Sequence, residues 1–209
     1  MRYFLAIALF ATGCMELPLG GPRYDSVRER MSEAPTSLFI HDEMSAGSIT
    51  AQRRGSDGWI AGTTDVTVDH GYVRAALDGN GQLEIDQLEI ALAPISLDGV
   101  FAKPAELQNV ILRLTHSTRA DATWTSSDNA SATLPMTFDF DWWIAIDGEA
   151  PIPLATQQLP SINVGVDLGG NGDVVEASVD ISASGVLWNW ADLVQITSLD
   201  LTLGAKTAD

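Results

Sequence analysis

The chain contains one cysteine, Cys14, so it forms no internal disulfide. Disulfides are common in exported domains, but 209 residues are enough to bury a core without them. Basic residues are also scarce, because 11 lysines and arginines stand against 28 aspartates and glutamates. The resulting net charge of −17 repels phosphate backbones, so the composition argues against a nucleic-acid partner.

Motifs for catalysis or cofactor binding are missing as well. The sequence has no GxSxG nucleophile motif, no phosphate-binding glycine loop and no HExxH metal motif. His41, His70 and His116 lie far apart in sequence, and none has the spacing of a metal ligand. We therefore predict a protein that is not an enzyme and that binds neither a cofactor nor a metal.

The amino-terminal segment has the features of an export signal. The apolar run Tyr3–Phe10 follows Arg2, and it is far shorter than the ~20 residues that a membrane-spanning helix needs. Its length and flanks fit a secretory signal peptide. Residues 11–14, Ala-Thr-Gly-Cys, resemble the lipobox of bacterial lipoproteins. This resemblance implies a signal peptide over residues 1–13 and acyl chains attached to Cys14.

The lipobox resemblance also implies a location and an organisation. Two or three acyl chains hold a soluble domain at a membrane where one chain is marginal. Met15 stands where inner-membrane retention signals usually carry aspartate, which favours the outer membrane, on its periplasmic or surface face. An ordinary signal peptide cut elsewhere is the alternative. We expect a tether over 14–35 with a short helix at 24–34, and a single β-rich domain over 36–209.

The clearest strand pattern runs from Leu134 to Ile146. Large apolar side chains occupy every second position of this segment, and Asp139 and Asp141 are among the residues between them. A period of two places the apolar set on a core face and the other set largely in solvent. A helix would scatter the two aspartates around an otherwise apolar cylinder.

One hairpin and one tight turn are predicted from turn sequences. Alternating apolar residues in 162–168 and 175–181 flank a glycine-rich stretch, which predicts a hairpin with a long loop. Residues 78–81, Asp-Gly-Asn-Gly, are a tight-turn sequence. Their partial match to a calcium-binding loop fails at the sixth position, where Leu83 stands in place of glycine.

Segments 85–92 and 196–203 share a pattern at an offset of 111 residues (85 to 196). In both, Ile-x-x-Leu interrupts the period of two, which predicts a β-bulge at the x-x positions. The similarity fits either a duplication or generic strand patterning. The fold prediction is an all-β antiparallel domain of about eight to ten strands. A closed barrel and a two-sheet sandwich both fit this pattern.

The tryptophans are the candidate ligand-binding residues. Trp142 falls on the core face of its segment, whereas Trp143 faces the same way as Asp139. Trp188 and Trp190 flank a single residue and share a face if the chain is extended. Exposed aromatic residues beside carboxylates are typical of a glycan-binding face, whereas aromatic residues inside a barrel would line a cavity for lipid. Packing in the core is the alternative.

Two functions therefore remain open for the domain. One is a binding protein for a lipid or another apolar small molecule held inside the fold. The other is a structural or interaction module at the cell surface that binds a protein or a glycan. An enzyme is the third class, and the missing catalytic set disfavours it. An exposed Trp143 would favour the interaction module.

Overall fold

The computed structural model describes residues 23–190 and 194–208, and for 188–190 it describes the backbone alone. Within these residues, one short helix precedes fifteen strands of a single sheet, in which the pairs are antiparallel. The predicted all-β antiparallel class is thus confirmed. In chain order the elements are α1 (Val27–Glu33), β1 (Thr36–Gly55), β2 (Gly58–Val66), β3 (Val68–Leu77), β4 (Gln82–Leu92), β5 (Ile95–Ser96), β6 (Ala105–Leu114), β7 (Thr118–Asp121), β8 (Thr123–Trp124), β9 (Ala130–Met136), β10 (Phe138–Ile146), β11 (Ile152–Pro153), β12 (Gln157–Gln158), β13 (Ile162–Gly170), β14 (Val175–Trp190) and β15 (Val194–Lys206).

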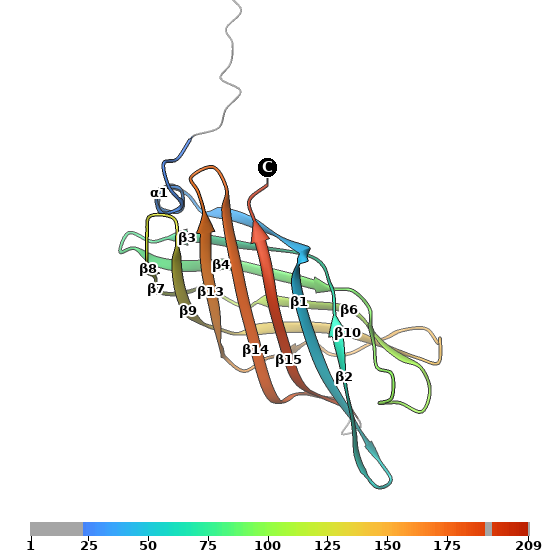
Figure 1. Ribbon diagram of the computed structural model, residues 1–209. Coiled ribbons are helices and arrows are strands. Elements are labelled where there is room, and N and C mark those ends of the chain that lie inside the picture. The colour runs from blue at the N-terminus through green and yellow to red at the C-terminus, as the bar shows by residue number, and fades with distance from the viewer. Residues whose placement is uncertain (1–22, 191–193, 209) are drawn as a thin grey trace, which may run out of the picture.

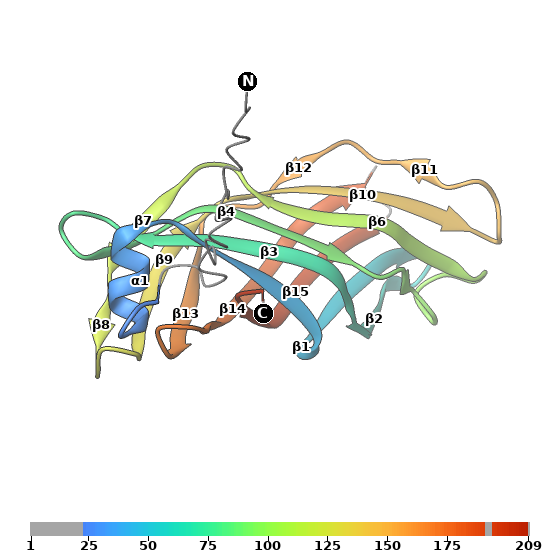
Figure 2. The same ribbon diagram turned by 90° about the horizontal axis from the view of Figure 1, so that it is seen from above.

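The sheet curls over itself into two walls. Its strand order is β11-β10-β6-β4-β3-β1-β15-β14-β13-β9-β8, and β2, β5, β7 and β12 pair with β1, β6, β4 and β10. One wall consists of β13, β14, β15 and β1 (Figure 1), and β3, β4, β6 and β10 cross it in the other wall (Figure 2). The core fills the space between the walls as one cluster of buried residues that extends from Val27 to Ala205.

Both alternatives for the architecture need correction. The ladder of hydrogen-bonded strands is not closed into a barrel, and the two walls belong to one sheet instead of two. Fifteen strands replace the expected eight to ten. Four of these strands, β5, β8, β11 and β12, have only two residues each. Periodicity cannot reveal such short pairings, because alternation is recognisable only over about four or more residues.

The chain passes from one wall to the other at Thr137. β9 pairs with β13 as far as Met136, and β10 pairs with β6 from Phe138 onward. The segment predicted as one strand is therefore two, but the alternation continues across the junction. Phe138, Phe140 and Trp142 are all buried in the core, as their positions in the pattern predict.

The predicted turn and hairpin are confirmed. Asp78–Gly81 joins β3 to β4, and the Asp78 carboxylate accepts hydrogen bonds from the backbone N–H groups of Asn80 at 2.8 Å and Gln82 at 3.0 Å. These bonds stabilise the charged form and lower the pKa of Asp78, with the bond from Gln82 as the largest cause. β13 and β14 form the hairpin with the longer loop.

The predicted bulges occur in both copies of the Ile-x-x-Leu motif. Asp86 has no partner in the β3–β4 register, and Thr197 has none in the β1–β15 register. The two residues occupy the same position of the motif, because 197 − 86 = 111. Each bulge lets the isoleucine before it and the leucine after it both face the core.

The short helix predicted before Pro35 is confirmed as α1. The Ser26 hydroxyl caps its amino terminus by accepting a hydrogen bond from the Glu29 N–H at 3.2 Å. Val27 and Met31 lie one turn apart and are both fully buried. The helix therefore packs against the domain through one apolar stripe, next to β3 (Figure 2).

Candidate functional site

The two adjacent tryptophans of β10 face opposite sides of the sheet, as predicted. Trp142 is 1% exposed and lies in the core beside Phe140, with 6.1 Å between their ring centroids. Trp143 is 38% exposed on the outer face. Trp143 can therefore contact a ligand from solvent, whereas Trp142 is a core residue.

Polar side chains of β6 lie next to Trp143. In the sheet register Trp143 is opposite Gln108 on one side and Pro153 of β11 on the other. Residues that are directly opposite in an antiparallel pair project from the same face. Gln108 also donates a hydrogen bond from Nε2 to Glu106 Oε2 at 2.6 Å. The amide and the carboxylate are thereby fixed to each other on the outer face beside the indole.

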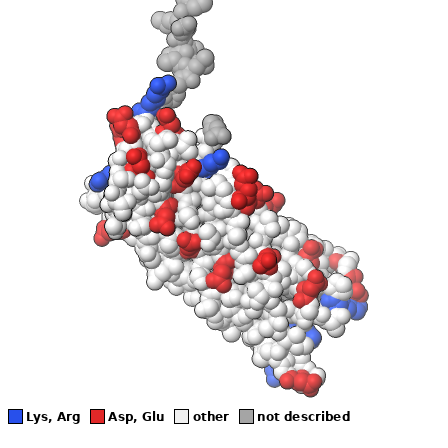
Figure 3. All heavy atoms as spheres, in the orientation of Figure 1, with Lys and Arg blue, Asp and Glu red and all other residues white. Residues whose placement is uncertain are grey.

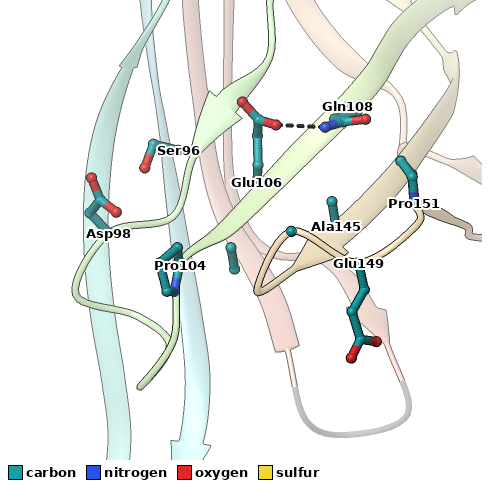
Figure 4. Close-up of a pocket in the computed structure, with 10 residues that line it drawn as sticks. Ser96, Asp98, Pro104, Glu106, Gln108, Ala145, Glu149 and Pro151 are labelled. Atoms are coloured by element: carbon teal, nitrogen blue, oxygen red, sulfur yellow. Dashed lines mark hydrogen bonds between the residues drawn. The ribbon is translucent and has the colours of Figure 1, made fainter.

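A surface pocket of about 490 Å³ adjoins these residues. It lies between the β5–β6 loop and the loop that follows β10. Figure 4 shows Glu106 and Gln108 along β6, with Ser96 and Asp98 on one side and Glu149 on the other. Gln108 lines the pocket and is also opposite Trp143, which itself does not line it, and we call Trp143 and the pocket together the β6–β10 site.

Local backbone features shape the rim of this site. After β10 the chain turns at Asp147 and Gly148, which both have positive φ angles of 58° and 72°. The Asp147 N–H donates to the Pro104 carbonyl at 2.7 Å, and its carboxylate pairs with Lys103. The two loops that border the pocket are therefore tied together. Asn109 has a φ of 49° and lies in a bulge of β6 opposite Trp142, next to Gln108.

The pocket is rich in hydrogen-bond acceptors. Asp98, Glu106 and Glu149 contribute three carboxylates, and none of the residues that line it is basic. Such a surface suits a ligand that presents hydroxyl or ammonium donors, and it repels anions.

An ion-pair network fixes the neighbouring strands of the same face. Arg113 of β6 contacts Glu89 of β4 at 2.8 Å and Asp141 of β10 at 2.5 Å. The hydrogen bond to Glu89 is the largest cause that raises the pKa of Arg113, so its guanidinium stays charged. Asp141, which the sequence placed on the outer face, therefore has a basic partner. This network links β4, β6 and β10 beside the candidate site.

The outer face of the opposite wall has a different character. Acidic side chains are spread over it (Figure 3). Two of them accept hydrogen bonds from hydroxyls on the neighbouring strand, Asp200 from Ser182 at 2.5 Å and Asp180 from Thr202 at 2.7 Å. Both pairs consist of small, solvated groups, and neither includes an aromatic side chain.

The side chains of the other predicted site residues are not among those that the structure describes. The backbone of Trp188 and Trp190 is paired with β15, in the wall opposite β10, and their side chains lie outside what the structure describes. Cys14 lies outside the described residues as well. Among the residues that are described, no three histidine, cysteine, aspartate or glutamate side chains are grouped to hold a metal ion.

Sequence reasoning missed most of the pocket. Glu106 and Gln108 do alternate with buried Leu107 in β6, so a period of two was present as a signal. Asp98 and Glu149 lie in loops, where no periodicity marks a residue as part of a site. Their proximity depends on the pairing of β6 with β10, which joins residues between 24 (114 to 138) and 41 (105 to 146) positions apart in sequence.

Comparison with known proteins identifies no family: no family model and no curated protein matches the chain. No helix within 23–190 and 194–208 has the length and apolarity needed to cross a membrane. The fold and the geometry of the outer face therefore define the class as an antiparallel β domain with an aromatic and acidic surface site.

Proposed function

We propose that this domain is a non-enzymatic binding module and that the β6–β10 site binds a neutral glycan. The supporting observation is the juxtaposition of the half-exposed indole of Trp143 with the hydrogen-bonded pair Gln108 and Glu106, next to an acceptor-rich pocket. Aromatic side chains that present an apolar face beside polar groups suit amphipathic ligands such as sugars.

The chemistry of the site selects among glycans. The apolar C–H face of a pyranose ring would stack on Trp143, and its hydroxyls would donate to the carboxylates of Glu106 and Asp98. The Gln108 amide is oriented by its bond to Glu106, which leaves its carbonyl oxygen as a further acceptor. Three carboxylates and a net charge of −17 disfavour anionic sugars.

A lipid held between the walls is the second proposal, and it has less support. The inward aromatic residues Phe138, Phe140 and Trp142 are all buried in the core cluster. Side chains that are packed closely against one another leave little apolar surface for a ligand to contact. Two pockets formed by the described residues, the one beside Gln108 and another along β1, β14 and β15, are open to solvent.

The lipobox resemblance supplies a proposed location. Lipidated at Cys14, the domain would be tethered to a membrane, and we propose the outer membrane. Substitution Cys14→Ser should abolish acyl labelling and move the protein from the membrane to the soluble fraction. A Cys14→Ser protein that still labels with fatty acid would contradict this proposal.

The glycan proposal is tested by calorimetric titration with neutral oligosaccharides, such as cellohexaose and chitohexaose. Trp143→Ala should weaken binding about tenfold or more, because a central aromatic residue contributes disproportionately to an interface. Glu106→Gln should also weaken it by removing an acceptor and releasing Gln108. The matched control is Trp59→Ala, which removes an indole of similar exposure (45% against 38% for Trp143) that does not line the pocket. Equal losses from Trp59→Ala and Trp143→Ala would contradict the proposal.

A further inference from the structure

The β1–β2 hairpin ends in a two-stranded ribbon that projects from the body. We call residues 53–61 the arm. Figure 1 shows the tip of this hairpin at the end of the molecule opposite α1. Burial alternates along the strands of the body, but Gly58–Ala61 are exposed whichever way their side chains face. Both faces of the arm are thus open to solvent near its tip.

The body of the domain begins at the base of the arm. At Gly62 an added Cβ would lie 2.9 Å from Val100 Cγ2, so β2 contacts the β5–β6 loop there. Arg53 fixes the base from the other strand, because its Nε donates to the Val100 carbonyl at 2.8 Å and its Cζ lies 5.9 Å from the Phe101 ring centroid. The arm is therefore attached to the body by specific contacts, and its tip extends beyond them.

The arm concentrates side chains that are rare elsewhere on the surface. Trp59 is 45% exposed and Ile60 is 41% exposed, and they are neighbours on opposite faces of the ribbon. In the register Trp59 is opposite Arg54, and Ile60 is opposite Arg53. Each apolar side chain thus shares a face with an arginine. Only Asp57 at the turn opposes this charge within the arm, in a chain with 11 basic and 28 acidic residues.

The placement of these residues restricts what could cover them. An isolated two-stranded ribbon is only marginally stable and has no core of its own. Packing in the core therefore does not explain why each face of the arm carries a large exposed apolar side chain. An occupant that docks on one side would cover Trp59 or Ile60, but not both. The interface of a lipid bilayer surrounds an inserted tip and buries both faces at once. Tryptophan and arginine suit that depth, because both have an apolar body and a polar end.

We propose that the arm docks on the surface of a phospholipid membrane that contains anionic lipids. Trp59 and Ile60 enter the boundary between headgroups and acyl chains, and Arg54 contacts lipid phosphates. The acidic body repels such a surface, but the repulsion is screened beyond about 8–10 Å at physiological ionic strength. A projecting arm brings Arg54 to the lipid ahead of the body, whereas Arg53 stays at the base with Val100. This surface is separate from the β6–β10 site.

The test is flotation with phosphatidylcholine vesicles with or without phosphatidylglycerol. It uses the chain from Met15 onward, which lacks Cys14 and retains the whole core cluster, 27–205. We expect flotation with the mixed vesicles. The double variant Trp59→Ser with Ile60→Ser should reduce it about tenfold or more, and Arg54→Gln about fivefold, as the contribution of one arginine near an anionic surface implies. The control Trp143→Ala should float like the unmodified chain.

Three outcomes would overturn the proposal. The first is that the unmodified chain floats with neither type of vesicle. The second is that the double variant floats to the same extent as the unmodified chain. The third is a chain that sediments as a dimer without lipid and as a monomer after Trp59→Ser with Ile60→Ser. That result would assign the arm to a second copy of the chain instead of a membrane. Circular dichroism of each variant verifies that it is folded.

Discussion

Strand β10 and the arm differ in how they expose their large apolar side chains to solvent. In β10, each step along the strand alternates between the core and the outer face, so that Trp142 is enclosed and Trp143 is half-exposed. In the arm, Trp59 and Ile60 occupy consecutive positions and both are exposed. The core thus accounts for the inward half of β10, but for neither apolar residue of the arm. Residues that the core does not require are the ones that the two binding proposals use.

The largest expected effect separates the two tryptophans of β10. Trp142→Ala should lower the free energy of unfolding by about 3–5 kcal/mol, because it removes a large side chain from a packed core. Trp143→Ala should change the free energy of unfolding by only about 0.5 kcal/mol, since much of the indole is already in solvent. Chemical denaturation of both variants measures the difference. Equal destabilisation would show that Trp143 is a packing residue.

A glycine pair contrasts a crowded position in the body with an open turn. At Gly204 an added Cβ would lie 2.4 Å from Met44 Cβ and 2.7 Å from the Met44 carbonyl oxygen, whereas at Gly79 it would meet nothing within 4 Å. Gly204→Ala should destabilise the fold by about 1–3 kcal/mol through overpacking. Gly79→Ala should be close to neutral. Thermal unfolding compares the two, and a neutral Gly204→Ala would mean that the bulged segment of β1 around Met44 moves away readily.

The arm should contribute little to folding. Trp59→Ser with Ile60→Ser should shift the free energy of unfolding by less than about 1 kcal/mol, because surface substitutions usually fall within about 0.5 kcal/mol each. Urea denaturation measures this shift beside that of Trp142→Ala. A loss as large as that of Trp142→Ala would place the arm in the core and remove the contrast with β10.

The smallest effect concerns the Asp78 turn and depends on pH. The pKa of Asp78 is lowered by folding, so its charged form contributes stability above its ordinary value of 3.8. That contribution is lost as the pH falls below 3.8 through the lowered pKa. Asp78→Ala should therefore be less stable than the unmodified chain at neutral pH and should approach it in acid. A stability difference that does not change with pH would contradict the role of the carboxylate.

Alternation and turn chemistry were enough to predict much of the fold. The inward set of β9 and β10, the turn at Asp78, the β13–β14 hairpin and the bulges at Asp86 and Thr197 all depend on local sequence, and all are confirmed. The single curled sheet was not predicted, because the passage between walls at Thr137 leaves the alternation unchanged. Which strands become neighbours depends on contacts distant in sequence.

The site was predictable to the same extent. The alternation that buried Trp142 also placed Trp143 outside, so the aromatic half of the site followed from the sequence. The acidic half required the pairing of β5 and β10 with β6, which brings Ser96 and Ala145 to Glu106. The arm was not predicted because Trp59 and Ile60 are adjacent. A period of two would place one of them in the core, whereas both are exposed.

We propose that the outer face of β6 and β10 binds a neutral glycan through Trp143. The most direct measurement is a nuclear magnetic resonance titration of the isotope-labelled protein with chitohexaose, following the indole and side-chain amide N–H signals. We expect saturable shifts of the Trp143 indole and Gln108 amide signals, while the Trp59 indole signal does not shift. Unchanged spectra, or shifts confined to residues away from β6 and β10, would contradict it.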